Sequence, residues 1–160
     1  MAKCNNKVLA SAVAVGVGMA AYKRTHATCG KCGDKISGKI HKIYAYGEVN
    51  RAAAELAGVN LRATYCDDCY KELMSEFNSY KYRGNYKGVS TYSVNYRGNT
   101  HTDDANGVSY TTDSYSEQYE AKRAIRQVAA VYGCDAVTHL EMDQDSSGQW
   151  TASGIICDFK

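Results

Sequence analysis

The stretch from Ala63 to Phe77, ATYCDDCYKELMSEF, places two cysteines at the start of an expected helix. Asp67 and Asp68 stand in its first turn, where the helix dipole favours acidic side chains. The apolar residues that follow recur at helical spacing; they are Tyr70, Leu73, Met74 and Phe77. The stretch therefore predicts a helix whose first turn presents Cys66 and Cys69.

A second cysteine pair, Cys29 and Cys32, precedes this stretch with the same two-residue spacing. Two residues between thiolates allow one tight turn to aim both sulfurs at a single tetrahedral ion. Four thiolates close the shell of Zn²⁺ and leave no position for water, so the expected site is structural. Its ligands are Cys29, Cys32, Cys66 and Cys69. The alternative is two disulfides or redox pairs, which an oxidising compartment would favour.

The segment between the cysteine pairs predicts two further elements. Lys39 to Tyr46 has partial strand character, and Glu48 to Ala57 reads as a short helix ended by Gly58. A CxxCG turn, a connecting hairpin and a CxxC at a helix start resemble a treble-clef or zinc-ribbon module over residues 27–79. The short helix is an insertion in such a module. It either packs on its own ribbon or binds a partner.

Composition limits the classes of function that this chain can have. It has 160 residues, 44% of them hydrophobic, a formal net charge of +2 and no proline, so it can build a core. Four thiolates around one Zn²⁺ would bring the net charge to about zero. Because a strong nucleic-acid binder needs a clustered basic face, nucleic acid is an unlikely partner. The alternative nucleic-acid-binding ribbon would use Lys31, Lys35, Lys39, Lys42 and the tyrosine-rich segment.

An apolar run, VLASAVAVGVGMAAY, occupies residues 8–22 between Lys7 and Lys23. As a helix it would reach about 22 Å, short of the ~30 Å hydrocarbon core of a bilayer. Three readings stay open: a membrane anchor or membrane-associated helix, a secretory signal cleaved near Ala21, and a soluble helix. Cys4, beside the run, is a candidate acylation site whose alternative is an unmodified thiol.

The C-terminal half predicts an antiparallel sheet with one packed helix. Alternation over Tyr92–Tyr96 and the run Val108–Tyr115 predict strands. Ser114 and Glu117 have capping-box spacing ahead of a helix that ends at Gly133. A strand over 135–143, a turn and a strand over 150–159 follow. The expected fold class is α+β: an N-terminal apolar helix, the zinc module, then this sheet and helix.

Two short motifs in this half carry a resemblance. Gly133-Cys-Asp-Ala-Val137 after the helix and Trp150-Thr-Ala-Ser-Gly154 in the last strand are similar to the YbjQ-type heavy-metal-binding domain and, distantly, to the RcsF-type envelope domain. The resemblance spans about residues 86–160 and implies a small α+β domain that assembles into rings. Ile155-Ile-Cys157 departs from the family's usual Thr-Ala-Val.

Other chemistry-bearing residues of this half give weaker signals. Cys134 and Cys157 lie near opposite ends of one expected hairpin, as a disulfide or as buried thiols. His139 is expected on the face that carries Val137 and Glu141, and a His and a Glu alone make a poor metal site. His101 reads as part of a solvated loop.

The chain divides into an apolar segment (1–26), a four-cysteine module (27–79) and an α+β domain (80–160), in which a tyrosine-rich sheet precedes the helix and the hairpin. No nucleophile–base pair, phosphate loop or carboxylate dyad is visible, so the sequence predicts a protein that is not an enzyme and identifies no small-molecule substrate. We expect a zinc-stabilised interaction or assembly protein, a homo-oligomer or partner of another protein, membrane-associated through residues 8–22 with a cytoplasmic body. The alternatives are a nucleic-acid-binding ribbon and an exported, disulfide-bonded envelope or stress sensor, secreted or periplasmic after signal cleavage.

Overall fold

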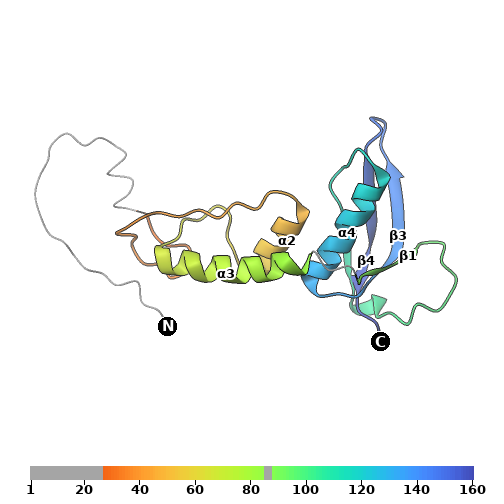
Figure 1. Cartoon of the computed structure of the whole chain (residues 1–160), viewed down its shortest axis with the longest axis horizontal. Coiled ribbons are helices and arrows are strands. Elements are labelled where there is room, and N and C mark those ends of the chain that lie inside the picture. Colours follow the sequence, from red (N-terminus) through yellow and green to blue (C-terminus); the bar gives the residue numbers. More distant parts are fainter. Residues whose placement is uncertain (1–26, 85–87) are drawn as a thin grey trace, which may run out of the picture.

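The protein has an α+β fold, described by a computed structural model over residues 27–84 and 88–160. This part of the chain holds three α-helices and one four-stranded mixed sheet. The cysteine-bearing segment lies at one end of the long axis and the sheet at the other (Figure 1). Helix α3 (Asp67–Arg83) runs along that axis from the first to the second.

Helices α2 and α3 begin and end where the sequence predicts a change of conformation. Helix α2 (Glu48–Leu56) is followed by Ala57 and by Gly58, whose φ is +66°. Helix α3 begins directly after Cys66, which has extended backbone. It continues to Arg83, so Tyr80 and Tyr82 belong to a helix and not to a sheet. Both helices predicted for the four-cysteine module are therefore confirmed. The second, α3, extends past the predicted module boundary at residue 79.

The sheet has the strand order β1-β3-β4-β2. Strands β3 (Ala136–Gln144) and β4 (Trp150–Cys157) form the expected hairpin, and β2 (Val108–Thr111) pairs with β4 antiparallel. Strand β1 (Ser90–Ser93) pairs with β3 in parallel, so the prediction of a wholly antiparallel sheet is wrong at this edge. The chain reaches β3 from β1 through β2 and a helix, and such a crossover returns the chain in the same direction.

Helix α4 (Gln118–Tyr132) covers one face of this sheet (Figure 1). Its expected apolar stripe is buried, with Ala121, Ile125 and Val128 fully enclosed. Gly133 ends the helix with φ +83°, as expected. The predicted capping box is wrong. The helix begins at Gln118, so Glu117 precedes it instead of lying in its first turn, and Glu117 makes no side-chain cap.

The described residues bury two apolar clusters, and α3 contributes to both. The larger cluster joins the sheet, α4 and α2, and contains Phe77. The smaller one lies around the cysteines and contains Leu73. The alanines of α2 pack in the larger cluster, against α4 as well as α3. Helix α2 therefore does more than cover its own module, because its small side chains let it lie close to α4 and connect that helix to α3.

Two expected strands differ from the structure. Residues 39–46 form no strand; His41 makes an isolated bridge with Tyr65. The strand expected over Tyr92–Tyr96 ends at Ser93, where the amide of Tyr96 donates to the Ser93 carbonyl (2.9 Å) and the chain turns. Alternation of side chains describes an extended chain, but a strand also needs a neighbour to pair with.

The apolar run at residues 8–22, Cys4 and His26 lie outside the described residues. Within the described ranges, none of the helices combines the length and the apolar character that a bilayer span requires.

Candidate metal centre

Two segments far apart in the sequence bring four cysteines together. The sulfur atoms of Cys29, Cys32, Cys66 and Cys69 all lie within 4.8 Å of one another. Cys29 and Cys69 are buried, Cys66 is half-buried and Cys32 is exposed. The predicted tetrad is therefore one cluster that could hold a metal ion, at the edge of the smaller apolar core.

The first pair sits in a tight turn that is held by hydrogen bonds between its own backbone groups. The Gly33 amide donates to the Cys29 carbonyl (2.9 Å), and the Cys29 amide donates to the Asp34 carbonyl (2.8 Å). Gly33 has φ +77°, a conformation that favours glycine. The turn reverses the chain within the space of the pair, which places both sulfurs on one side.

Gly30 lets this turn lie directly on the strand-like segment before α3. Its amide donates to the Thr64 carbonyl at 2.8 Å. A Cβ atom at this position would lie 2.4 Å from Cβ of Ala63. This close approach sets the first pair beside the second.

The second pair is carried by the start of α3. Cys66 precedes the helix, and its carbonyl accepts the Tyr70 amide at 2.9 Å. Tyr65, almost fully buried, holds the preceding residues through bonds between its hydroxyl and the backbone of Asn60. The cysteines are thus fixed between a buried aromatic ring and a helix.

Two side-chain contacts connect the surroundings of the site to α3. Nζ of Lys31 lies 2.8 Å from Oε1 of Glu72, and this carboxylate raises the pKa of Lys31. Nε2 of His41 contacts a carboxylate oxygen of Asp67, and its ring stacks on Tyr70 with centroids 4.3 Å apart. His41 is therefore engaged outside the tetrad. The Lys31–Glu72 contact was not predicted from the sequence, although Lys31 lies inside the first cysteine pair and Glu72 follows the second.

The electrostatics of the cluster favour a bound cation. Burial opposes ionisation of Cys29, but backbone N–H groups of Cys32, Cys66 and Lys31 directed at its sulfur outweigh burial and lower its pKa to about 6. Burial and contact with the other three sulfurs raise the pKa of Cys69. Four adjacent thiols cannot all ionise without a positive charge between them, and a divalent cation would supply it.

The donor set also fits Zn²⁺ in size. A regular tetrahedron with Zn–S bonds of about 2.3 Å has edges of about 3.8 Å. The sulfur separations, at most 4.8 Å, are close to that value. Sulfur ligands in this arrangement suit Zn²⁺ but are not specific to it, because iron also accepts four thiolates.

Other residues singled out in the sequence lie apart from this cluster. Cys157 is a buried thiol and Cys134 a half-buried one. Cys157 pairs in register with Ala136, so Cys134 lies beyond the end of the β3–β4 ladder. His101 is exposed in a loop, as expected.

His139 does not share the face of Val137. Val137 is buried, whereas His139 is exposed with φ +50°, at a point where the strand pairing shifts. The strand bulges at this position, which breaks the alternation that the prediction assumed.

No family model matches this chain, and neither a curated protein nor a solved structure matches it.

Proposed function

We propose that this protein is a non-catalytic scaffold whose N-terminal module is held together by one structural zinc ion. The observation that carries the proposal is the clustering of four cysteine sulfurs within 4.8 Å. The cluster lies at the start of α3, and the other end of that helix packs in the sheet core. A zinc ion there would fix the turn at Cys29 to α3, and α3 would hold that turn at a set distance from the sheet.

Metal and thiol analysis of the purified full chain tests this proposal. We expect one zinc per chain and four cysteines protected from alkylation until a chelator is added. Absence of metal, with Cys29, Cys32, Cys66 and Cys69 in disulfides, would instead favour the exported, disulfide-bonded protein.

Sequence motifs in both halves of the chain support a proposal for its architecture. The CxxC turn and the CxxC helix start support a treble-clef or zinc-ribbon description, and the motifs at 133–137 and 150–154 support a YbjQ-like domain.

We propose self-association through the sheet, whose edges are β1 and β2. Val108 on β2 is 54% exposed, which gives that edge an apolar residue to bury. Light scattering of the wild type and of Val108→Lys tests this, since a charge on the edge should favour the monomer.

Association with a membrane is proposed for residues 8–22, which are apolar and flanked by basic residues. We place the rest of the chain in the cytoplasm, where reducing conditions keep thiolates available for zinc. Flotation of the full chain with liposomes, compared with a chain that begins at Lys23, measures this contribution. Cleavage near Ala21 in the native protein would contradict it.

A second candidate function, single-stranded nucleic-acid binding, is favoured by one observation. Tyr44 and Tyr46 are 64% and 78% exposed, and their rings are parallel with centroids 6.1 Å apart. Such rings can stack on bases, and Lys42 precedes them in the chain. Of the lysines that would assist, Lys31 is already paired with Glu72. Salt-dependent binding of an oligonucleotide, lost in Tyr44→Ala, would support this function over the first.

A further inference from the structure

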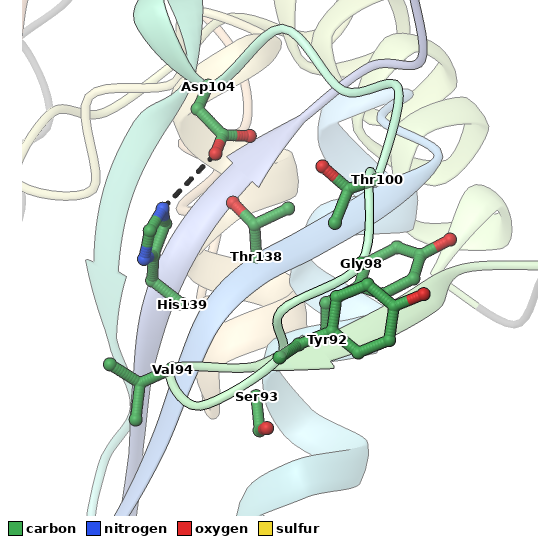
Figure 2. A pocket seen from close by; sticks show the side chains of 9 residues that line it. Tyr92, Ser93, Val94, Gly98, Thr100, Asp104, Thr138 and His139 are labelled. Carbon is green, nitrogen blue, oxygen red and sulfur yellow. Dashed lines mark hydrogen bonds and ion pairs between the residues drawn. The ribbon is translucent and has the colours of Figure 1, made fainter.

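A cavity of about 190 Å³ lies on the sheet, far along the chain from the four clustered cysteines. Thr138 and His139 of β3 form its floor. Tyr92 of β1 lies on one side of it, and Asp104, in the segment between β1 and β2, lies on another (Figure 2). Thr100 faces the space between them. Concave sites with a few converging polar groups are where proteins bind small molecules.

The floor of the cavity is shaped by the bulge in β3. The pairing of β3 with β4 shifts between Thr138 and Glu141, and His139 there has φ +50°. A left-handed conformation is costly for a residue with a Cβ atom. Such strain persists where the surrounding structure fixes it, and it is common at binding sites.

Gly154 on β4 makes room for this bulge. A Cβ atom at Gly154 would lie 2.9 Å from the Thr138 carbonyl oxygen and 2.9 Å from Cγ1 of Val137. The bulge turns His139 out of the core and toward Asp104, whose Oδ2 lies 3.2 Å from Nε2 of His139. The glycine in the Ala-Ser-Gly motif was the signal in the sequence for this distortion.

Asp104 supplies a fixed negative charge at the cavity. Its Oδ1 lies 3.4 Å from Sγ of Cys157. Burial opposes its ionisation, but hydrogen bonds from Thr102, Thr138, Cys157 and His139 outweigh burial and lower its pKa. No lysine or arginine of the described residues lines the cavity to neutralise this carboxylate.

The wall opposite the carboxylate is aromatic. The rings of Tyr92 and Tyr96 lie 5.1 Å apart at 52° to each other. The amide of Tyr96 donates to the Ser93 carbonyl, which fixes the turn that carries the second ring. Faces of tyrosine rings attract cations through their quadrupole.

We propose that this cavity binds a small organic cation, an alkylammonium or guanidinium group, with Asp104 as its counter-charge and Tyr92 and Tyr96 as its aromatic wall. The hydroxyl of Thr100, which shares a hydrogen bond with the hydroxyl of Thr102 (2.5 Å), also lines the cavity and can accept a hydrogen bond from such a group. The cation can belong to a free amine or to the side chain of a basic residue in a partner protein, because both present the same chemistry.

The test is an NMR titration of the full chain, with labelled tyrosine and histidine rings, using n-butylammonium as the probe. A ligand of about five heavy atoms binds such a site in the millimolar range. We expect saturable shifts of the Tyr92, Tyr96 and His139 ring signals. The neutral n-butanol should give none, because it lacks the charge that Asp104 recognises.

Matched variants separate the site from the fold. Asp104→Asn should weaken binding about tenfold, the effect of losing about 1.4 kcal/mol of ionic attraction. Asp103→Asn is the control, since Asp103 bonds to Asn106 and does not line the cavity; it should bind as the wild type does. Tyr92→Leu keeps an apolar wall without the quadrupole and should weaken binding about two- to fivefold.

The source of the cation is read from a second probe, a short peptide with one lysine. Tighter binding of the peptide than of n-butylammonium assigns the site to a protein partner, and equal or weaker binding assigns it to a free amine. The proposal is overturned if neither cation shifts the ring signals, if Asp104→Asn binds them unchanged, or if a neutral sugar such as glucose binds and they do not. None of these results depends on zinc, so the two proposals fail separately.

Discussion

The two ends of α3 pack into apolar cores of different size. At the sheet end, sixteen buried apolar residues among those that the structure describes form one core, and most of them come from the three helices and the sheet. At the cysteine end, six buried residues do so, and two of these are Cys29 and Cys69 themselves. The cysteine end has isolated bridges in place of paired strands. A core this small needs a further stabilising link. We expect a metal ion bound by the four sulfurs to supply that link at the cysteine end.

We expect the largest effect from removal of the proposed zinc ion. We expect chelation of the purified protein, or the double change Cys66→Ser and Cys69→Ser, to unfold the cysteine end while the sheet stays folded. Structural zinc sites contribute on the order of 10 kcal/mol at neutral pH. Hydrogen exchange should show loss of protection at the amides of Gly30, His41 and Tyr65, which bond across the module.

Amides of β4 should stay protected after that treatment. The control is Cys134→Ser, a thiol outside the tetrad, which should leave both ends protected. If chelation unfolded β4 and the module together, the two ends would be one cooperative unit.

Two truncations on α3 should show separately how much each core stabilises its own end of the helix. Leu73→Ala removes a side chain of the smaller core and Phe77→Ala one of the larger core. Each should cost about 2–5 kcal/mol. Because Leu73 and Phe77 belong to different cores, we expect Leu73→Ala to lower hydrogen-exchange protection at the cysteine end and Phe77→Ala to lower the denaturant midpoint for unfolding of the sheet.

The fluorescence of Trp150, the single tryptophan, follows the sheet in urea. Equal loss at both ends from either truncation would show that α3 transmits stability along its full length. Lys81→Ala, an exposed position on the same helix, is the control for helix propensity.

Gly30→Ala should have the next largest effect. The added methyl group would overlap Ala63, so the turn must move away from residues 63–64 and displace Cys29 and Cys32. Overpacking of this kind costs about 1–3 kcal/mol. We expect weaker retention of zinc in competition with a chromogenic chelator.

Gly38→Ala is the matched control, because a Cβ atom there meets nothing within 4 Å. Zinc retention in Gly38→Ala should equal that of the wild type. Equal retention in Gly30→Ala would mean that the contact with Ala63 does not position the first cysteine pair.

The smallest effect concerns Glu48, at the start of α2. Glu48 is 3% exposed, its Oε1 accepts the Asp113 amide, and its Oε2 is buried without a hydrogen-bond partner among the described residues. Burial raises its pKa above the ordinary value of 4.5. The folded protein therefore binds this proton more tightly than the unfolded chain does.

The stabilising contribution of that proton is complete below the unfolded pKa and is lost as pH rises through the raised folded pKa. Glu48→Gln should remove this part of the pH dependence and make the protein more stable than the wild type at neutral pH. Urea unfolding followed by Trp150 at pH values from about 4.5 to 7.5 gives the difference between the two proteins. Glu141→Gln, at an exposed site, should follow the wild type across that range.

Local patterns predicted much of this fold. The cysteine spacing identified the tetrad, and helical periodicity with terminal glycines identified α2, α3 and α4. Strand predictions were less accurate: residues 39–46 lack a pairing strand, and β1 is parallel to its neighbour. Strand pairing joins residues that are distant in the chain, so the alternation in Tyr92–Tyr96 could not report it.

Signals that lie within a few residues of one another were enough to predict the two CxxC pairs, the glycines that end α2 and α4, and the hairpin of β3 and β4. The packing of α2 against both α3 and α4 depends on the tertiary structure, as does the bulge that turns His139 out of the core toward Asp104. The reason is physical. A turn or a helix end is stabilised within a few residues, whereas a core, a bulge and a cavity exist only when distant segments pack together.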